Sequence, residues 1–183
     1  MANVYMLLAR GFEESEAIVP ADLLKRAGAN LILVATEGGL AVPGAHGFTV
    51  TADITLDEVR REEIDCLVLP GGGLGTQLLG DNPRVLDLIE FCANHGLPIG
   101  AICAAPSILG KMRLLDGRNA AVYPGFGESM KHANVTGRKV EHDDIFITAE
   151  GMGVSFEFGF KLVEVLYGSE KANDIRSQTR FAN

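Results

Sequence analysis

The segment of residues 98–106 (PIGAICAAP) contains the side chain best placed for chemistry, the thiol of Cys103. An apolar strand runs directly into a helix here, so the residue at the junction must occupy a sharp, strained turn of the kind that presents a nucleophile. The small residues Ala101 and Ala104 allow that turn to close. Because the positive end of a helix favours a thiolate, we predict that Cys103 is a reactive thiol with a lowered pKa.

The other two cysteines show no such context. Cys66 lies inside an apolar run and Cys92 falls late in a helical pattern, so both are interpreted as small core residues. An odd number of cysteines without a CxxC pair argues against a disulfide framework and against a zinc site. The four histidines include no pair with metal-ligand spacing, and we predict no metal centre.

Residues 10–16 (RGFEESE) place three carboxylates at the start of a helix. Glu13 and Glu14 fit a solvated first turn, where acidic side chains are favoured electrostatically. Glu16 lies a turn further in and is expected to point toward the strand ends. A carboxyl group buried beside a thiolate would have a raised pKa. We therefore predict that Glu16 stays protonated and either donates a hydrogen bond to the sulfur or acts as a general acid/base.

A glycine-rich turn, residues 70–75 (PGGGLG), follows another apolar run. Glycines leave backbone N–H groups free to approach a ligand, so this turn is a candidate source of oxyanion donors. The backbone N–H of Ala104 would point at the same anion. The turn lacks the GK[ST] of a phosphate loop and the GxGxxG spacing of a dinucleotide site. This turn is evidence for a functional site only because it lies at the end of a predicted strand.

Elements that could position these residues alternate along the chain as short apolar runs and helical patterns, which is typical of an α/β protein. Strands are predicted at 3–9, 30–36, 65–69, 98–102, 119–123, 139–141 and 145–148. Helices are predicted at 13–27, 83–94, 104–111, 127–132, 154–167 and 171–180, with a hairpin excursion over 38–53. We predict a single domain over residues 1–183, a flavodoxin-like, doubly wound, mostly parallel sheet sandwiched by helices. Ligands bind such sheets at the carboxyl ends of the strands.

The composition limits the classes of function. A chain of 183 residues with 47% apolar and 22% charged residues is typical of one globular domain. Its formal net charge of −8 and the absence of a basic run argue against nucleic-acid binding. No apolar stretch approaches the ~18–20 residues that span a bilayer, and the first residues lack the features of a signal peptide. We expect a cytoplasmic protein that binds neither nucleic acid nor membrane.

Four stretches together resemble the ThiJ/PfpI superfamily, and within it the clade of the parkinsonism-associated deglycase (DJ-one-like proteins). They are residues 9–17, 65–75, 101–106 and 149–158, in the family's order. The resemblance implies that Cys103 is the family's elbow cysteine and that Glu16 is the protonated glutamate bonded to it. It implies that Gly72 and Ala104 supply the backbone donors beside the sulfur. It also implies a homodimer without an obligate cofactor.

The sequence departs from the family at two positions. The family often carries a histidine where this chain has Tyr123, and the protease-like branch has a histidine where this chain has Ala104. Peptidase or amidase chemistry is therefore disfavoured. His46 stands where relatives often carry arginine, and it either reaches the pocket, from this chain or from a partner subunit, or lies in solvent. Tyr123 and Gly73 are further candidates for the pocket.

The resemblance implies two functions, which the sequence does not rank firmly. One is a glyoxalase III-like or deglycase-type enzyme that acts on small 2-oxoaldehydes such as methylglyoxal and glyoxal, or on their adducts. In that enzyme Cys103 is the nucleophile and Glu16 the general acid/base. The alternative is an oxidative-stress sensor or chaperone whose Cys103 oxidises to a sulfinate, without significant turnover. The expected ligand in the first case is a small carbonyl compound.

Overall fold

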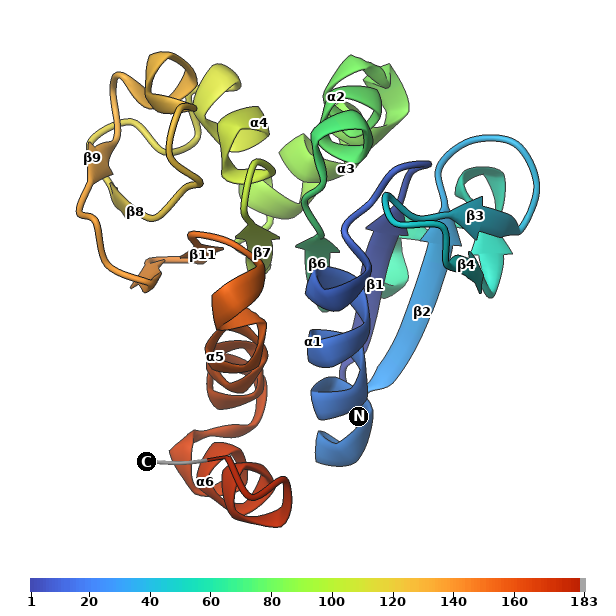
Figure 1. Ribbon diagram of the computed structural model, residues 1–183, viewed down its shortest axis with the longest axis vertical. Helices are drawn as coiled ribbons and strands as arrows, with labels where there is room; N and C mark the ends of the chain where they lie inside the picture. Colours follow the sequence, from blue (N-terminus) through green and yellow to red (C-terminus); the bar gives the residue numbers. More distant parts are fainter. Residues whose placement is uncertain (182–183) are drawn as a thin grey trace.

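A seven-stranded sheet forms the centre of the computed structural model, which describes residues 1–181 (Figure 1). The strands are β1 (Asn3–Leu8), β2 (Asn30–Ala35), β5 (Ile54–Thr55), β6 (Cys66–Leu69), β7 (Ile99–Ile102), β10 (Val140–Asp143) and β11 (Phe146–Ala149). Their order is β10-β11-β7-β6-β1-β2-β5. All neighbours pair in parallel except β10 and β11, which form an antiparallel hairpin at one edge. The predicted flavodoxin-like, mostly parallel sheet is confirmed.

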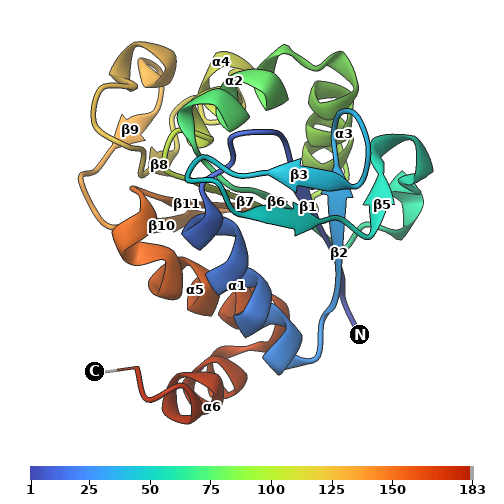
Figure 2. The ribbon, with the colours of Figure 1, turned by 45° about the vertical axis from the view of Figure 1, so that its right-hand side comes forward.

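Helices cover both faces of the sheet (Figure 2). One face carries α1 (Glu14–Ala27), α5 (Ser155–Tyr167) and α6 (Ser169–Gln178), and the other carries α2 (Gly73–Asp81), α3 (Pro83–Asn94) and α4 (Pro106–Lys111). Four short 3-10 helices lie at Leu56–Glu58, Arg61–Glu63, Gly127–Met130 and Met152–Val154. Within residues 1–181, no helix combines the length and the apolar character that crossing a bilayer requires.

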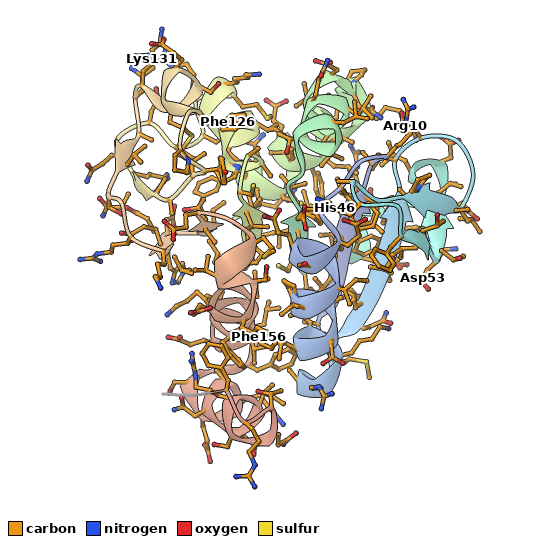
Figure 3. The ribbon with its side chains drawn as sticks, in the orientation of Figure 1. Arg10, His46, Asp53, Phe126, Lys131 and Phe156 are labelled. Carbon is orange, nitrogen blue, oxygen red and sulfur yellow. The ribbon has the colours of Figure 1, made fainter. Side chains whose placement is uncertain are left out.

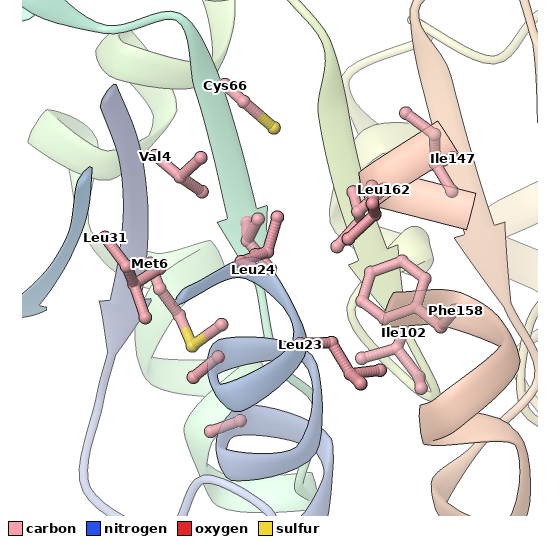
Figure 4. Packing of buried hydrophobic residues seen from close by; sticks show 14 of the residues in the cluster. Val4, Met6, Leu23, Leu24, Leu31, Cys66, Ile102, Ile147, Phe158 and Leu162 are labelled. Carbon is pink, nitrogen blue, oxygen red and sulfur yellow. The ribbon is translucent and has the colours of Figure 1, made fainter. Parts of the chain in front are cut away.

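The core on the α1 and α5 side shows why the central strands are continuous apolar runs. Met6 on β1 and Ile102 on β7 point toward this side, where they meet Leu24 of α1 and Phe158 and Leu162 of α5 (Figure 4). All five side chains are fully buried. A second cluster fills the opposite face, so the strands are covered on both sides. Burial of each such side chain stabilises the fold by about 1.5–3 kcal/mol.

A β-hairpin of β3 (Ala41–Pro43) and β4 (Thr49–Thr51) leaves the main sheet after β2, as predicted for residues 38–53. It contacts the segment that joins β1 to α1. The N–H of Gly11 donates to the carbonyl of Pro43 at 2.8 Å, and the N–H of Ala45 donates to the carbonyl of Phe12 at 2.9 Å. The hairpin therefore fixes the backbone that leads into the first turn of α1.

The sequence-based prediction missed helix α2, because it assigned the glycine-rich segment as a turn with no helix after it. Three glycines in GLGTQLLGD lower the intrinsic helix propensity and hide the pattern. The helix after the elbow also begins later than predicted, at Pro106 instead of Ala104. Residues 103–105 form a turn between β7 and α4.

The predicted strand over residues 119–123 is wrong in length and in place. Only β8 (Asn119–Ala120) is a strand, and it pairs in parallel with β9 (Asn134–Val135) in a separate two-stranded sheet. The edge of the main sheet beyond β7 is occupied by β11. The backbone N–H of Ala121 instead donates to the side chain of Thr148, which draws this segment across the end of β11.

Candidate active site

Three neighbouring strands deliver the predicted site residues to one place. β7, β6 and β1 are adjacent in the sheet and parallel, so their carboxyl ends lie at the same edge. β7 leads into Cys103, β6 leads into Gly71 and Gly72, and β1 leads into the helix that carries Glu16. The topology therefore brings together residues that are far apart in the sequence.

Cys103 occupies a strained turn between β7 and α4, as predicted. Its φ of +64° lies in the left-handed region, which costs a non-glycine residue about 1–3 kcal/mol. Two hydrogen bonds hold this backbone. The N–H of Cys103 donates to the carbonyl of Ala149 at 2.9 Å, and the N–H of Tyr123 donates to the carbonyl of Cys103 at 2.9 Å. The thiol is partly buried, whereas Cys66 and Cys92 are fully buried.

The carboxyl group of Glu16 is fully buried beside the elbow, which confirms that this side chain points to the strand ends. The N–H of Gly71 donates to Glu16 Oε2 at 3.0 Å. Interaction with the side chain of Cys103 lowers the pKa of this carboxyl group, against the larger effect of burial. The second oxygen, Oε1, is buried and lacks an assigned hydrogen-bond partner among residues 1–181. Burial without a hydrogen-bond partner disfavours a negative charge on this carboxyl group.

Glycines 71 and 72 let the backbone after β6 pass between α1 and the elbow. A Cβ on Gly71 would lie 2.5 Å from Glu16 Oε2 and 2.6 Å from Cys103 Cβ. Gly72 has a φ of +94°, and a Cβ there would lie 2.3 Å from the carbonyl oxygen of Gly11. The glycine run of the sequence indicated this close approach. The role of Gly71 as the donor to the glutamate was not predicted.

Interactions with the backbone N–H groups of Gly72 and Ala104 favour the thiolate form of Cys103 and lower its pKa. Gly72 is the residue before α2, and Ala104 follows the sulfur's own residue. Two donors from different segments therefore converge on one atom.

The predicted lowering of the thiol pKa is nevertheless wrong. Burial, and then the negative charge of Glu16, raise the pKa of Cys103 to about 12. The helix contribution is small because α4 has six residues and begins three residues after the sulfur. Burial also raises the pKa of Glu16 to about 7, in line with a carboxyl group that keeps its proton into the neutral range. Glu16 and Cys103 together therefore lose one proton near neutral pH, and the second proton leaves only at high pH.

His46 lies in the loop between β3 and β4 and bonds the first turn of α1 (Figure 3). Its Nδ1 is 3.0 Å from Glu14 Oε2 and 3.3 Å from Glu13 Oε2, and its side chain is two-thirds exposed. The N–H groups of His46 and Phe48 donate to Glu14 Oε1. Although burial opposes it, hydrogen bonds from backbone N–H groups and from His46 lower the pKa of Glu14 to about 2. Within residues 1–181, no histidine has a hydrogen bond to Cys103.

Glu13, Glu14 and His46 also form a grouping that the sequence spacing concealed. One ligand atom from each lies within 4.8 Å of the other two. His46 is 32 residues from Glu14 in the sequence, so pairwise spacing could not reveal it. The His46 ring contacts both carboxyl groups, and its hydrogen bond to Glu14 is the first cause of a raised pKa at His46.

Tyr123 and Gly73 line two different pockets. The half-exposed ring of Tyr123 packs near Gly151 and lines a pocket of about 370 Å³ with Met152 and Val154. Gly73 is the exposed first residue of α2 and lines a different pocket. Both candidates are therefore pocket residues, but not of one pocket.

Comparison with known proteins places this fold and site in a family. The model of the DJ-1/PfpI family matches residues 2–165. The chain belongs to the DJ-1/PfpI family. It is 34% identical over 175 residues to Protein dj-1beta of Drosophila melanogaster, with 94% of each chain covered. It is 34% identical over 153 residues to a deglycase of Pyrococcus horikoshii, covering 84% of this chain and 88% of that one. The structure of oxidized Toxoplasma gondii DJ-1 superposes with a TM-score of 0.94 and 31% identity over all of both chains.

In this DJ-1/PfpI chain the site combines a thiol, a buried carboxyl group and two nearby backbone N–H groups. A thiolate adds to electrophilic carbon, and a carboxyl group with a pKa near neutrality can both give and take a proton. Preorganised N–H groups stabilise negative charge as it develops. This set of groups suits covalent addition to a carbonyl group.

Proposed function

We propose that this DJ-1/PfpI protein is a cysteine-dependent enzyme of the glyoxalase or deglycase type. Its substrates are small 2-oxoaldehydes, such as methylglyoxal and glyoxal, or their adducts, and its product is a 2-hydroxy acid. The observation that carries the proposal is the buried carboxyl group of Glu16 beside Cys103, with Oε1 left unpartnered. Similarity to a deglycase of Pyrococcus horikoshii supports it.

The first step is addition of sulfur to the aldehyde. In the reactive form of the pair the charge is on Cys103 and the proton on Glu16. The sulfur bonds to the aldehyde carbon, the carbonyl π electrons move to oxygen, and Glu16 gives its proton to that oxygen to yield a hemithioacetal. The N–H groups of Gly72 and Ala104 stabilise the charge, an effect worth ~3–4 kcal/mol per donor in a well-formed oxyanion hole.

The second step moves hydrogen between two carbons. The carboxylate of Glu16 now takes the proton from the carbon bonded to sulfur, which leaves an enediolate. The hydroxyl proton moves from the oxygen on that carbon to the oxygen on the neighbouring carbon, and Glu16 returns its proton to the neighbouring carbon. The result is a thioester of the hydroxy acid. Water then adds to the thioester, sulfur leaves as thiolate, and methylglyoxal plus water has become lactate. No oxidant or reductant is consumed.

Lactate formation from methylglyoxal by the purified full chain tests this proposal. Cys103→Ser and Glu16→Gln are each expected to lower turnover by about 10²–10⁴-fold, because each removes a group that bonds to the substrate or moves its proton. Glu90→Gln, an exposed carboxyl change on α3, serves as the matched control. Normal turnover by either site variant would exclude the mechanism.

A second function, redox sensing, has its own support in the similarity to oxidized Toxoplasma gondii DJ-1. In this role peroxide oxidises Cys103 to the sulfinate, with two oxygen atoms gained from two peroxide molecules and water released. The donors at Gly72 and Ala104 then hold the sulfinate oxygens. Mild peroxide should add two oxygens at Cys103 alone, as measured by peptide mass. An unchanged peptide mass together with lactate formation would contradict redox sensing and leave only the enzymatic function.

Pairing with a second copy of the chain belongs to the same proposal. Ile18 on α1, Phe48 in the β3–β4 hairpin and Met152 before α5 are large apolar side chains with 46%, 70% and 56% of their surface exposed. Burial of these side chains between two subunits would remove them from water. Light scattering should give twice the chain mass of 19.5 kDa. A monomer mass at micromolar concentration would contradict the dimer.

A further inference from the structure

One histidine and two glutamates from different segments converge at the start of α1. Glu13 is the residue before α1, Glu14 is its first residue, and His46 lies in the loop between β3 and β4. The Nδ1 atom of His46 is 3.0 Å from Glu14 Oε2 and 3.3 Å from Glu13 Oε2. The fold thus brings together one nitrogen and two carboxylate oxygens, the kinds of atom that bind metal ions in proteins.

The two carboxyl groups are more enclosed than the solvated first turn that the sequence predicts for them. The side chain of Glu13 is 16% exposed and that of Glu14 is 12% exposed. Within residues 1–181, neither has a Lys or Arg partner at 4.0 Å or less. Their one basic neighbour in that range is His46, which carries a charge only when it is protonated. A metal cation between the three groups would offset both negative charges.

The carboxyl group of Glu14 is held in place by the backbone of the hairpin loop. The N–H groups of His46 and Phe48 donate to Glu14 Oε1 at 2.8 and 3.4 Å. A Cβ on Gly44 would clash with the same oxygen, so this glycine lets the carboxyl group lie against the loop. The other oxygen, Oε2, faces the ring of His46. Metal sites commonly fix a carboxylate ligand in this way, through hydrogen bonds from groups that are not themselves ligands.

The spacing of these atoms suits a zinc ion. Zinc bonds histidine nitrogen and carboxylate oxygen at about 2.0–2.2 Å, and at the tetrahedral angle such bonds hold the two atoms roughly 3.3–3.5 Å apart. The observed separations of 3.0 and 3.3 Å are close to this spacing, so the side chains need to move little. The side chain of His46 is 66% exposed, which leaves a path from solvent for the ion and for a water ligand.

We propose that Glu13, Glu14 and His46 bind one Zn²⁺ ion, with water as the fourth ligand. The ring ligates as the neutral imidazole, so the ion takes the place of the proton on Nδ1. The bound ion joins the β3–β4 hairpin to α1, and Cys103 is not among its ligands. This site does not depend on the proposed function, because it uses neither the thiol nor Glu16.

Titration of the full-length chain with Zn²⁺, followed by isothermal calorimetry, tests the binding. The Cys103→Ser variant is used beside the wild type, because Cys103 is the one thiol that is not fully buried and could bind zinc itself. Saturation at one ion per chain is expected for both proteins. Binding that does not saturate would overturn the proposal. Binding by the wild type alone would assign the ion to the thiol and would overturn it as well.

Two ligand variants and two matched controls locate the ion. His46→Gln and Glu13→Gln should each raise the dissociation constant for Zn²⁺ by about tenfold or more, since loss even of a group that only supports a ligand costs about 10–100-fold. His132→Gln and Glu90→Gln change exposed residues of the same types elsewhere and should leave it unchanged. These comparisons are made in the Cys103→Ser background. Equal affinity in the ligand variants and the controls would refute the site.

Two further measurements distinguish bound zinc from a loss of folding. Zinc should raise the melting temperature of the wild type, because it binds the folded state, and should leave that of His46→Gln unchanged. Cobalt in place of zinc should give the visible absorption of a tetrahedral ion without a thiolate charge-transfer band. An equal zinc-induced rise in His46→Gln, or a thiolate band in the wild type, would contradict the proposed ligands. Lactate formation from methylglyoxal tests the proposed function separately, so either proposal can fail without the other.

Discussion

Replacement of Glu16 by glutamine should remove the loss of stability that the wild type undergoes as the pH rises through 7. Burial raises the pKa of Glu16 in the folded protein from 4.5 to about 7. The folded state therefore binds this proton more tightly than the unfolded state. The stability that results is fully present below pH 4.5 and is lost as the pH rises through 7. The difference between these pKa values corresponds to about 3 kcal/mol.

Glutamine keeps the shape of the side chain and cannot ionise. Its amide oxygen can still accept the N–H of Gly71, which bonds Glu16 Oε2 at 3.0 Å. Any constant cost of the substitution is the same at every pH. The free energy of unfolding of Glu16→Gln relative to the wild type should therefore rise by up to about 3 kcal/mol between about pH 4 and about pH 8. The sign follows from the raised pKa alone.

Urea denaturation of both proteins at several pH values measures this difference, with Glu90→Gln as an exposed control that should show no such trend. A difference between wild type and Glu16→Gln that stays constant with pH would mean that Glu16 is ionised in the folded protein at ordinary pH. The neutral acid on which the proposed chemistry depends would then be absent. A difference of the opposite sign would refute the assignment of burial as the dominant cause.

Three further changes test the site. Gly71→Ala puts a methyl group 2.5 Å from Glu16 Oε2 and should lower the free energy of unfolding by about 1–3 kcal/mol, measured by urea denaturation. Glu16→Gln removes the charge that raises the pKa of Cys103, so alkylation of the thiol, followed by mass, should begin at lower pH than in the wild type. Glu14→Gln should flatten the loss of stability from pH 4.5 toward 2 in acid titration, because the pKa of Glu14 is lowered to about 2.

The sequence predicts the elements of this fold wherever a pattern is local and strong. The central strands are apolar runs bounded by turns, and α1 ends at Gly28 in the left-handed conformation expected of a C-terminal glycine. Helix α2 escaped prediction because it contains three glycines, and close contact with another segment does not account for all of them. Gly75 does have the backbone of Phe12 where its Cβ would lie. Such contacts depend on tertiary packing, which a local pattern does not contain.

The identity of the site residues could be predicted, but their electrostatics could not. The elbow at Cys103 follows from a strand that runs into a helix, and the inward direction of Glu16 follows from helical spacing. The pKa of Cys103 depends instead on how far the strands and loops from the rest of the chain bury the sulfur. The bond between His46 and Glu14 joins residues 32 apart and depends on where a hairpin packs.

Burial alone cannot decide which atom of the pair holds the negative charge. It raises the pKa of the thiol and of the carboxyl group alike, because both are neutral when protonated. Backbone donors do distinguish them. The backbone N–H groups of Gly72 and Ala104 lower the pKa of Cys103, whereas the one backbone N–H that lowers the pKa of Glu16 is that of Gly71. Donors stabilise the charged form of the atom they face, so this imbalance acts against burial and brings the state with a thiolate and a neutral acid closer in energy to the state with a carboxylate and a thiol. The glycine-rich turn after β6 thus supplies one donor to each partner, and the additional donor at Ala104 directs the charge toward sulfur.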